Sequence, residues 1–110
     1  MVGPNEAKVV NETFRAMKRR GAAELVSIED KEKVFSELRT KVSHLDWSTF
    51  LDALRILENV RTHAYKLGDQ VHDGVLTKRS GFEHLRAAFP EVGRDVLDHA
   101  FAQGLYESSK

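Results

Sequence analysis

Two Asp–His pairs have the residue types and spacing that metal chemistry needs. Asp69 lies three positions before His72, and Asp95 lies four positions before His99. Residues three or four apart share one face of a helix, so each pair would present a carboxylate and an imidazole together. Zinc accepts both of these ligands. Such pairs also arise as ordinary surface ion pairs, and nothing in the sequence shows that the two pairs meet. We therefore predict that no metal or other cofactor is bound.

Other forms of catalysis find no support in the sequence. There are no cysteines, which excludes thiolate nucleophiles, disulfides and zinc sites with sulfur ligands. Ser27, Ser48 and Ser80 lie near the expected starts of helices, where serine caps the first amides. The sequence has neither a Gly-x-Ser-x-Gly elbow nor a glycine-rich phosphate loop. We therefore predict a noncatalytic protein.

Composition places the chain among ordinary globular proteins. Its 110 residues are 41% apolar and 31% charged, and 17 basic side chains balance 17 acidic ones. Attraction to nucleic acid or to anionic membranes therefore has no support from the chain as a whole. No apolar run approaches the length of a membrane span, and the first residues do not resemble a secretory signal. The expected location is cytoplasmic.

A long central helix is the clearest element that the sequence predicts. Its apolar residues follow strict 3,4 spacing, which keeps one stripe of a helix facing its neighbours. Asp46 is the expected N-cap, and the helix should run from Trp47 to about His72. Gly68 costs about 1 kcal/mol relative to alanine inside a helix, yet the stripe keeps its phase beyond it. The stripe consists of Phe50, Ala53, Leu57, Val60, Ala64, Leu67 and Val71.

Shorter helices are expected on both sides of the central one. Two precede it, over residues 6–20 behind an Asn5 cap and from a Ser27 cap onward. Two follow it, over residues 81–89 behind a capping box of Ser80 and Glu83, and over residues 91–103.

These elements predict an all-α fold, a four- to five-helix bundle built around one long central helix. We expect one helical domain over residues 1–106 and a disordered C-terminal tail over residues 107–110.

The last two expected helices resemble the helix-turn-helix half of winged-helix regulators. The resemblance is carried by a capped short helix, a tight turn at Phe89–Pro90 and the ending Gln103-Gly104-Leu105-Tyr106. It implies that the second helix enters the major groove of DNA. That helix carries more acidic than basic side chains, which would bring carboxylates near phosphates, so DNA binding is our alternative function. The residues that would contact phosphates are Lys78, Arg79, Arg86 and Arg94.

The segment from Leu85 to Val92 is also similar to the Phe-Pro turn between the first two helices of CUE-type ubiquitin-binding domains. Two unrelated families share this kind of turn. It therefore indicates two apolar-faced helices joined at Phe89–Pro90, and we assign the chain to neither family.

The second half of the central helix is the preferred candidate for binding another protein. Its apolar stripe narrows there, and the small Ala64 and Gly68 would let a second helix approach closely. We expect a regulatory or adaptor protein that acts through protein–protein contacts, as a helix-mediated homodimer and without a membrane partner. The sequence leaves open whether this stripe is a dimer interface or the core of one molecule. Its residues, the distal seam, are Val60, Ala64, Leu67 and Val71, with Phe82 and Phe89 as accessory anchors.

Overall fold

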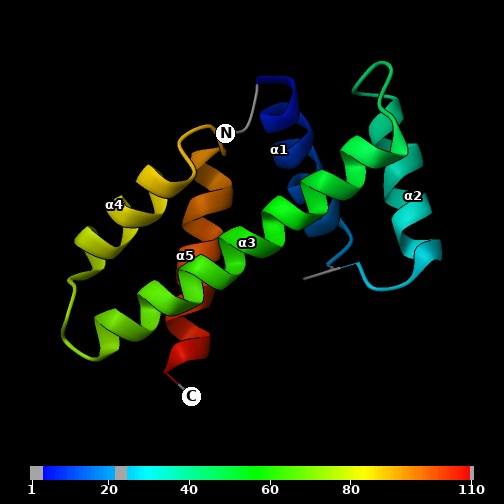
Figure 1. Cartoon of the computed structure of the whole chain (residues 1–110). Coiled ribbons are helices and arrows are strands. Elements are labelled where there is room, and N and C mark those ends of the chain that lie inside the picture. The colour runs from blue at the N-terminus through cyan, green and yellow to red at the C-terminus, as the bar shows by residue number, and fades with distance from the viewer. Residues whose placement is uncertain (1–3, 22–24, 110) are drawn as a thin grey trace. The chain divides into compact units, whose positions relative to one another are not determined.

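Helices are the regular secondary structure in the part of the chain that the structure describes. The computed structural model describes residues 4–21 and 25–109, and within these there are five α-helices and no strand. The predicted all-α helical bundle around one long helix is confirmed, because the described elements are all helices and α3, labelled in Figure 1, is 26 residues long. The helices are α1 (Pro4–Arg19), α2 (Ile28–Arg39), α3 (Trp47–His72), α4 (Lys78–Ala88) and α5 (Arg94–Ser108).

Two compact units share the central helix. Unit 1 is Met1–Ile56 and unit 2 is Leu57–Lys110. Unit 1 therefore holds α1, α2 and the start of α3, and unit 2 holds the rest of α3 with α4 and α5. One unbroken helix runs through both units. The single domain over residues 1–106 stays a prediction.

Aromatic rings hold α2 against the start of α3 in unit 1. The ring centroid of Phe35 lies 5.2 Å from that of Trp47 and 5.6 Å from that of Phe50. Phe50 and Leu38 are fully buried, and α1 adds the equally buried Val10 to the same core. Edge-to-face and tilted ring pairs add stabilisation beyond the apolar area that they bury.

An ion-pair cluster joins α2 to the end of α1. Glu37 accepts a hydrogen bond from Arg19 at 2.7 Å and a longer one from Arg20 at 3.4 Å. The hydrogen bond from Arg19 lowers the pKa of Glu37 below its ordinary value. The stabilisation that comes with this shift is present at neutral pH and is lost as the pH falls through the lowered pKa. Its contribution is modest because the side chains are partly exposed.

Two of the predicted helix caps are confirmed. The Ser27 hydroxyl accepts from the Asp30 amide at 3.1 Å, and the Asp46 carboxylate accepts from the Thr49 amide at 2.7 Å. Hydrogen bonds from the Thr49 side chain and amide lower the pKa of Asp46. Behind this cap, α3 runs from Trp47 to His72 as predicted, without a break at Gly68.

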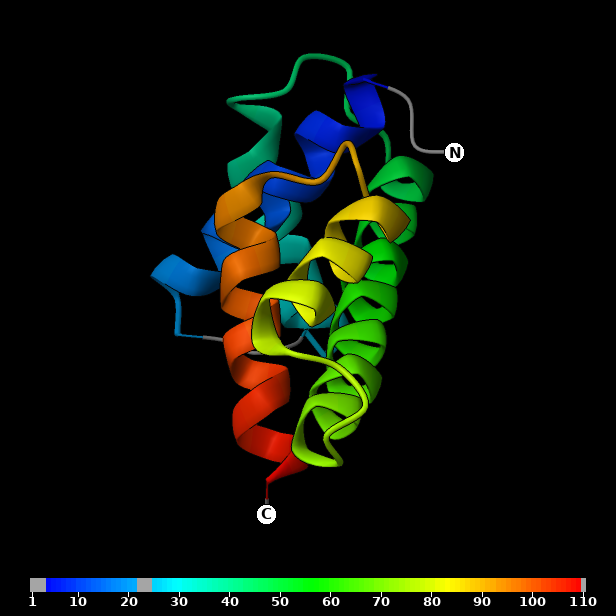
Figure 2. The same ribbon diagram turned by 90° about the vertical axis from the view of Figure 1, so that its left-hand side faces the viewer.

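A close crossing of α3 and α5 is the basis of unit 2. A Cβ atom added to Gly104 would lie 2.5 Å from the carbonyl oxygen of Ala64, and one added to Gly68 would lie 2.8 Å from the carbonyl oxygen of Gly104. Only glycine lets the two backbones approach this closely. Gly81 of α4 similarly faces the ring of Phe101 on α5. Figures 1 and 2 show α4 and α5 beside the second half of α3.

The predicted start of α4 was wrong. The helix begins at Lys78, because Thr77 is its N-cap and accepts from the Ser80 amide at 3.0 Å. Ser80 therefore lies inside the first turn and forms no capping box with Glu83.

The predicted bounds of α5 were also wrong. The helix begins at Arg94, because residues 89–92 form a turn in which the Val92 amide donates to the Phe89 carbonyl at 3.2 Å. It then continues through Gly104 to Ser108, whereas the prediction ended the helix before Gly104. Lys110 lies outside the described residues.

The first two helices differ from the prediction only at their ends. α1 begins at Pro4, so Asn5 is a helical residue and the predicted cap is wrong. α2 ends at Arg39, and the buried Leu45 lies in the connection that leads into α3.

Replacing the observed cap of α4 should separate the two assignments of its start. Thr77→Ala removes the acceptor for the Ser80 amide, so we expect the free energy of unfolding to fall by about 1 kcal/mol. Ser80→Ala should change it by less than about 0.5 kcal/mol, because the Ser80 side chain caps nothing at this position. Urea denaturation followed by circular dichroism measures both changes. A larger loss for Ser80→Ala than for Thr77→Ala would restore the capping box.

Candidate functional site

The distal seam lies in the interior of unit 2. Val60, Ala64 and Leu67 are buried within a single chain, and Val71 is half-buried. Ala64 faces Gly104 of α5, and the Val71 side chain lies next to Gly81 of α4. Within one chain, the seam therefore forms part of the core of unit 2. A second protein would reach these side chains only by separating α3 from α4 and α5.

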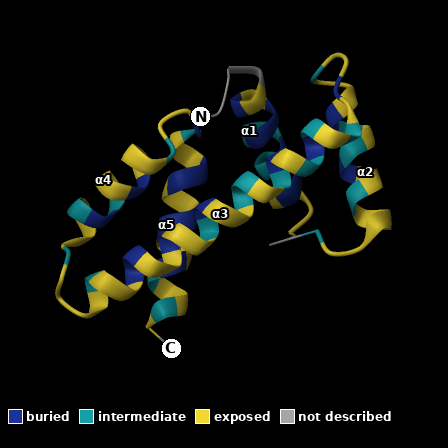
Figure 3. Cartoon of the chain, in the orientation of Figure 1, coloured by how far each residue is buried: buried dark blue, intermediate teal, exposed yellow. Residues whose placement is uncertain are grey.

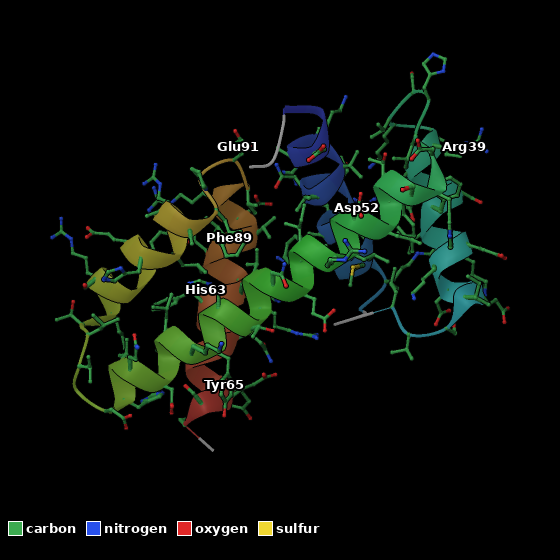
Figure 4. The ribbon with its side chains drawn as sticks, viewed as in Figure 1. Arg39, Asp52, His63, Tyr65, Phe89 and Glu91 are labelled. Atoms are coloured by element: carbon green, nitrogen blue, oxygen red, sulfur yellow. The ribbon has the colours of Figure 1, made fainter. Side chains whose placement is uncertain are left out.

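The two accessory anchors are half-buried and make ring contacts inside unit 2. The centroid of Phe82 lies 5.9 Å from that of Phe101, and the Arg94 guanidinium lies 6.0 Å above the Phe82 ring. The Phe89 ring meets that of His63 on α3 edge-on, with the ring centroids 5.6 Å apart. Both side chains are labelled in Figure 4. Both phenylalanines therefore help to join helices of their own unit.

The four cations of the DNA-binding alternative are exposed on α4 and at the start of α5. These are Lys78, Arg79, Arg86 and Arg94. Two of them lie close to carboxylates of their own helices, Arg79 at 3.5 Å from Glu83 and Arg94 at 3.8 Å from Asp98. The carboxylates next to these two arginines reduce the positive field that would attract phosphates.

The Asp–His pairs form no shared cluster within the described residues. There, no group of three or more histidine, cysteine, aspartate or glutamate side chains is placed to hold a metal ion. His72 instead has its Nε2 atom 2.8 Å from the Leu105 carbonyl oxygen, where it ties the end of α3 to α5.

An open groove in unit 1 is a feature that the sequence analysis missed. It is bounded by the start of α1, the connection between α2 and α3, and the first turn of α3. His44 on its edge has a φ of 60°, in the left-handed region. The lining mixes aliphatic, acidic and basic residues, and its Lys41 already lies 3.8 Å from Glu12. The groove therefore defines no single class of ligand.

The solvent-facing side of α3 in unit 2 is the second feature that the sequence analysis missed. Its side chains lie opposite the distal seam, and all are exposed, as the yellow segments of α3 in Figure 3 show. Tyr65, labelled in Figure 4, is a large aromatic residue that keeps 45% of its surface exposed. The signal in the sequence was this tyrosine between charged neighbours on the polar side of an amphipathic helix. This α3 outer face consists of Glu58, Asn59, Thr62, Tyr65 and Lys66.

The fold places the chain in the class of all-α helical bundles. Comparison with known proteins finds no matching family model, no similar curated protein and no similar solved structure. Among the described helices, none has both the length and the apolar character that crossing a membrane requires.

Proposed function

We propose that this chain is a noncatalytic protein-binding protein of the regulatory or adaptor type, which works in the cytoplasm as a helix-mediated homodimer. The observation that carries the proposal is the exposure of Tyr65, the aromatic residue of the α3 outer face. Tyrosine is enriched at protein interfaces because its ring buries a large apolar area while its hydroxyl keeps a polar contact.

The packing of unit 2 makes the α3 outer face suitable for binding. The seam residues on the opposite side of the helix are buried, and the crossing at Gly68 and Gly104 leaves no space between α3 and α5. A helix held in this way has little backbone freedom to lose on binding. The proposal therefore moves the interface from the distal seam to the opposite side of the same helix.

Capture of partners from cells of the source organism tests this proposal. The tagged chain should retain bound protein after the lysate is treated with nuclease. Tyr65→Asp should reduce that bound protein about tenfold, because it removes the aromatic residue of this face and adds a charge. The matched control is Val75→Asp, which makes the same kind of change at a residue that is 68% exposed in the turn after α3. It should retain normal binding.

Two results would contradict the proposal. Capture that disappears on nuclease treatment would favour the DNA-binding alternative. Equal capture by the wild type, Tyr65→Asp and Val75→Asp would show that the α3 outer face takes no part in binding.

A further inference from the structure

The two charged residues of the α3 outer face carry opposite charges and lie at equal distances on either side of its middle residue, Thr62. Glu58 lies four positions before Thr62 and Lys66 lies four positions after it, while Asn59 and Tyr65 lie three positions on either side. At 100° per residue, all five fall within about 120° of the helix surface. Neither Glu58 nor Lys66 forms an ion pair with any residue that the structure describes. The two charges are therefore available to an external partner.

We propose that the occupant of this face is a second copy of the chain, docked antiparallel with the two-fold axis at Thr62. This inference rests on the proposed function and names the partner. Reversal about Thr62 places Glu58 of one copy level with Lys66 of the second copy, and the symmetry repeats the pair at the other end. The same operation places Tyr65 level with Asn59 of the second copy. The short Thr62 side chains meet at the axis, where they allow the helices to approach.

The charges also select against the other arrangement of two helices. A parallel pair in register would bring Glu58 against Glu58 and Lys66 against Lys66, which is repulsive at both ends. One helix face is a small interface compared with the 1,200–2,000 Å² or so that stable complexes bury. The dimer is therefore a weak one, and it weakens further as added salt screens its exposed ion pairs.

Charge reversal tests the arrangement directly. Glu58→Lys gives two Lys–Lys contacts in the antiparallel dimer, and Lys66→Glu gives two Glu–Glu contacts. Each variant alone should self-associate about tenfold more weakly than the wild type, since two attractive pairs become repulsive. An equimolar mixture of the two variants should recover association, because lysines at 58 and 66 of one chain then face glutamates at 66 and 58 of the other. The double variant Glu58→Lys/Lys66→Glu should recover it as well. Sedimentation velocity over a range of concentrations measures all of these species.

Arg86→Glu is the control, because it reverses an exposed charge on α4 and should leave self-association unchanged. Self-association that is insensitive to both single reversals, or that is not recovered in the mixture, would overturn the antiparallel arrangement while leaving a protein-binding function intact. A chain that stays monomeric at high concentration yet captures other proteins through Tyr65 would overturn the dimer, including the homodimer of the proposed function, and would leave the protein-binding role intact. Monomeric behaviour together with no capture would overturn both proposals.

Discussion

Gly104→Ala is expected to lower the free energy of unfolding by about 2–3 kcal/mol, the upper part of the range for inserting a methyl group into a packed interior. The new Cβ would lie 2.5 Å from the carbonyl oxygen of Ala64 and 2.6 Å from its carbonyl carbon. These are backbone atoms, so no side-chain rotation relieves the clash and α5 must move away from α3. The loss appears despite the gain of about 1 kcal/mol that alanine ordinarily brings over glycine inside a helix.

The matched control is Ala102→Gly, two residues earlier in α5 and exposed. It should cost about 1 kcal/mol through helix propensity alone. Gly68→Ala should also destabilise, and combining it with Gly104→Ala should cost less than the sum, because both methyl groups are relieved by the same separation of helices. Chemical denaturation followed by circular dichroism measures the series. A stabilising effect of Gly104→Ala would mean that α3 and α5 do not cross closely.

Gly104 shows why the sequence predicted part of unit 2 incorrectly. A glycine near the end of an amphipathic stretch is typical of a helix C-terminus, and the prediction ended α5 there. The structure continues the helix to Ser108, because the missing side chain is needed for contact with Ala64. The two uses of glycine differ only in what lies across from it. That neighbour belongs to a helix 40 positions earlier, and local sequence carries no record of it.

The start of α4 shows the same limit at a helix cap. Ser80 and Glu83 match a capping box, but Thr77 matches an N-cap three residues earlier. The earlier start places Gly81 inside the helix, where it packs against Phe101 of α5. Two caps were therefore available in the sequence, and the structure uses the earlier one.

The central helix could be predicted almost completely because its signals agree with each other. The Asp46 cap, the 3,4-spaced stripe and the continuation past Gly68 all indicate the bounds that the structure has. The same stripe was also the predicted binding surface, and its residues Val60, Ala64 and Leu67 are buried within one chain. A regular apolar stripe indicates that its residues are buried. The sequence pattern is the same whether they are buried within one chain or between two chains. The exposed face that carries Tyr65 follows from knowing which side α4 and α5 already cover.

Phe50→Ala is expected to cost about 3–5 kcal/mol, because Phe50 is the largest fully buried side chain among the described residues. Phe50 is fully buried, and its ring lies 5.4 Å from Trp47 and 5.6 Å from Phe35. Truncation removes a large apolar side chain and leaves a cavity between α2 and α3 that the surrounding rings fill only in part. Because Trp47 is the only tryptophan, its fluorescence reports the loss at the site of the change. In a guanidinium titration followed by tryptophan fluorescence, the variant should unfold at a lower midpoint concentration than the wild type.

Phe50→Leu distinguishes lost volume from a general sensitivity of the helix. Leucine retains much of the buried volume, so it should cost less than half as much as alanine. Val26→Ala is the matched control, because this residue of unit 1 is 77% exposed and its truncation should change the free energy by less than about 0.5 kcal/mol. If Phe50→Ala cost no more than Val26→Ala, the aromatic contact between α2 and the start of α3 would not hold unit 1 together. The expected order of loss is therefore Phe50→Ala, then Phe50→Leu, then Val26→Ala, and it follows from the burial of one ring.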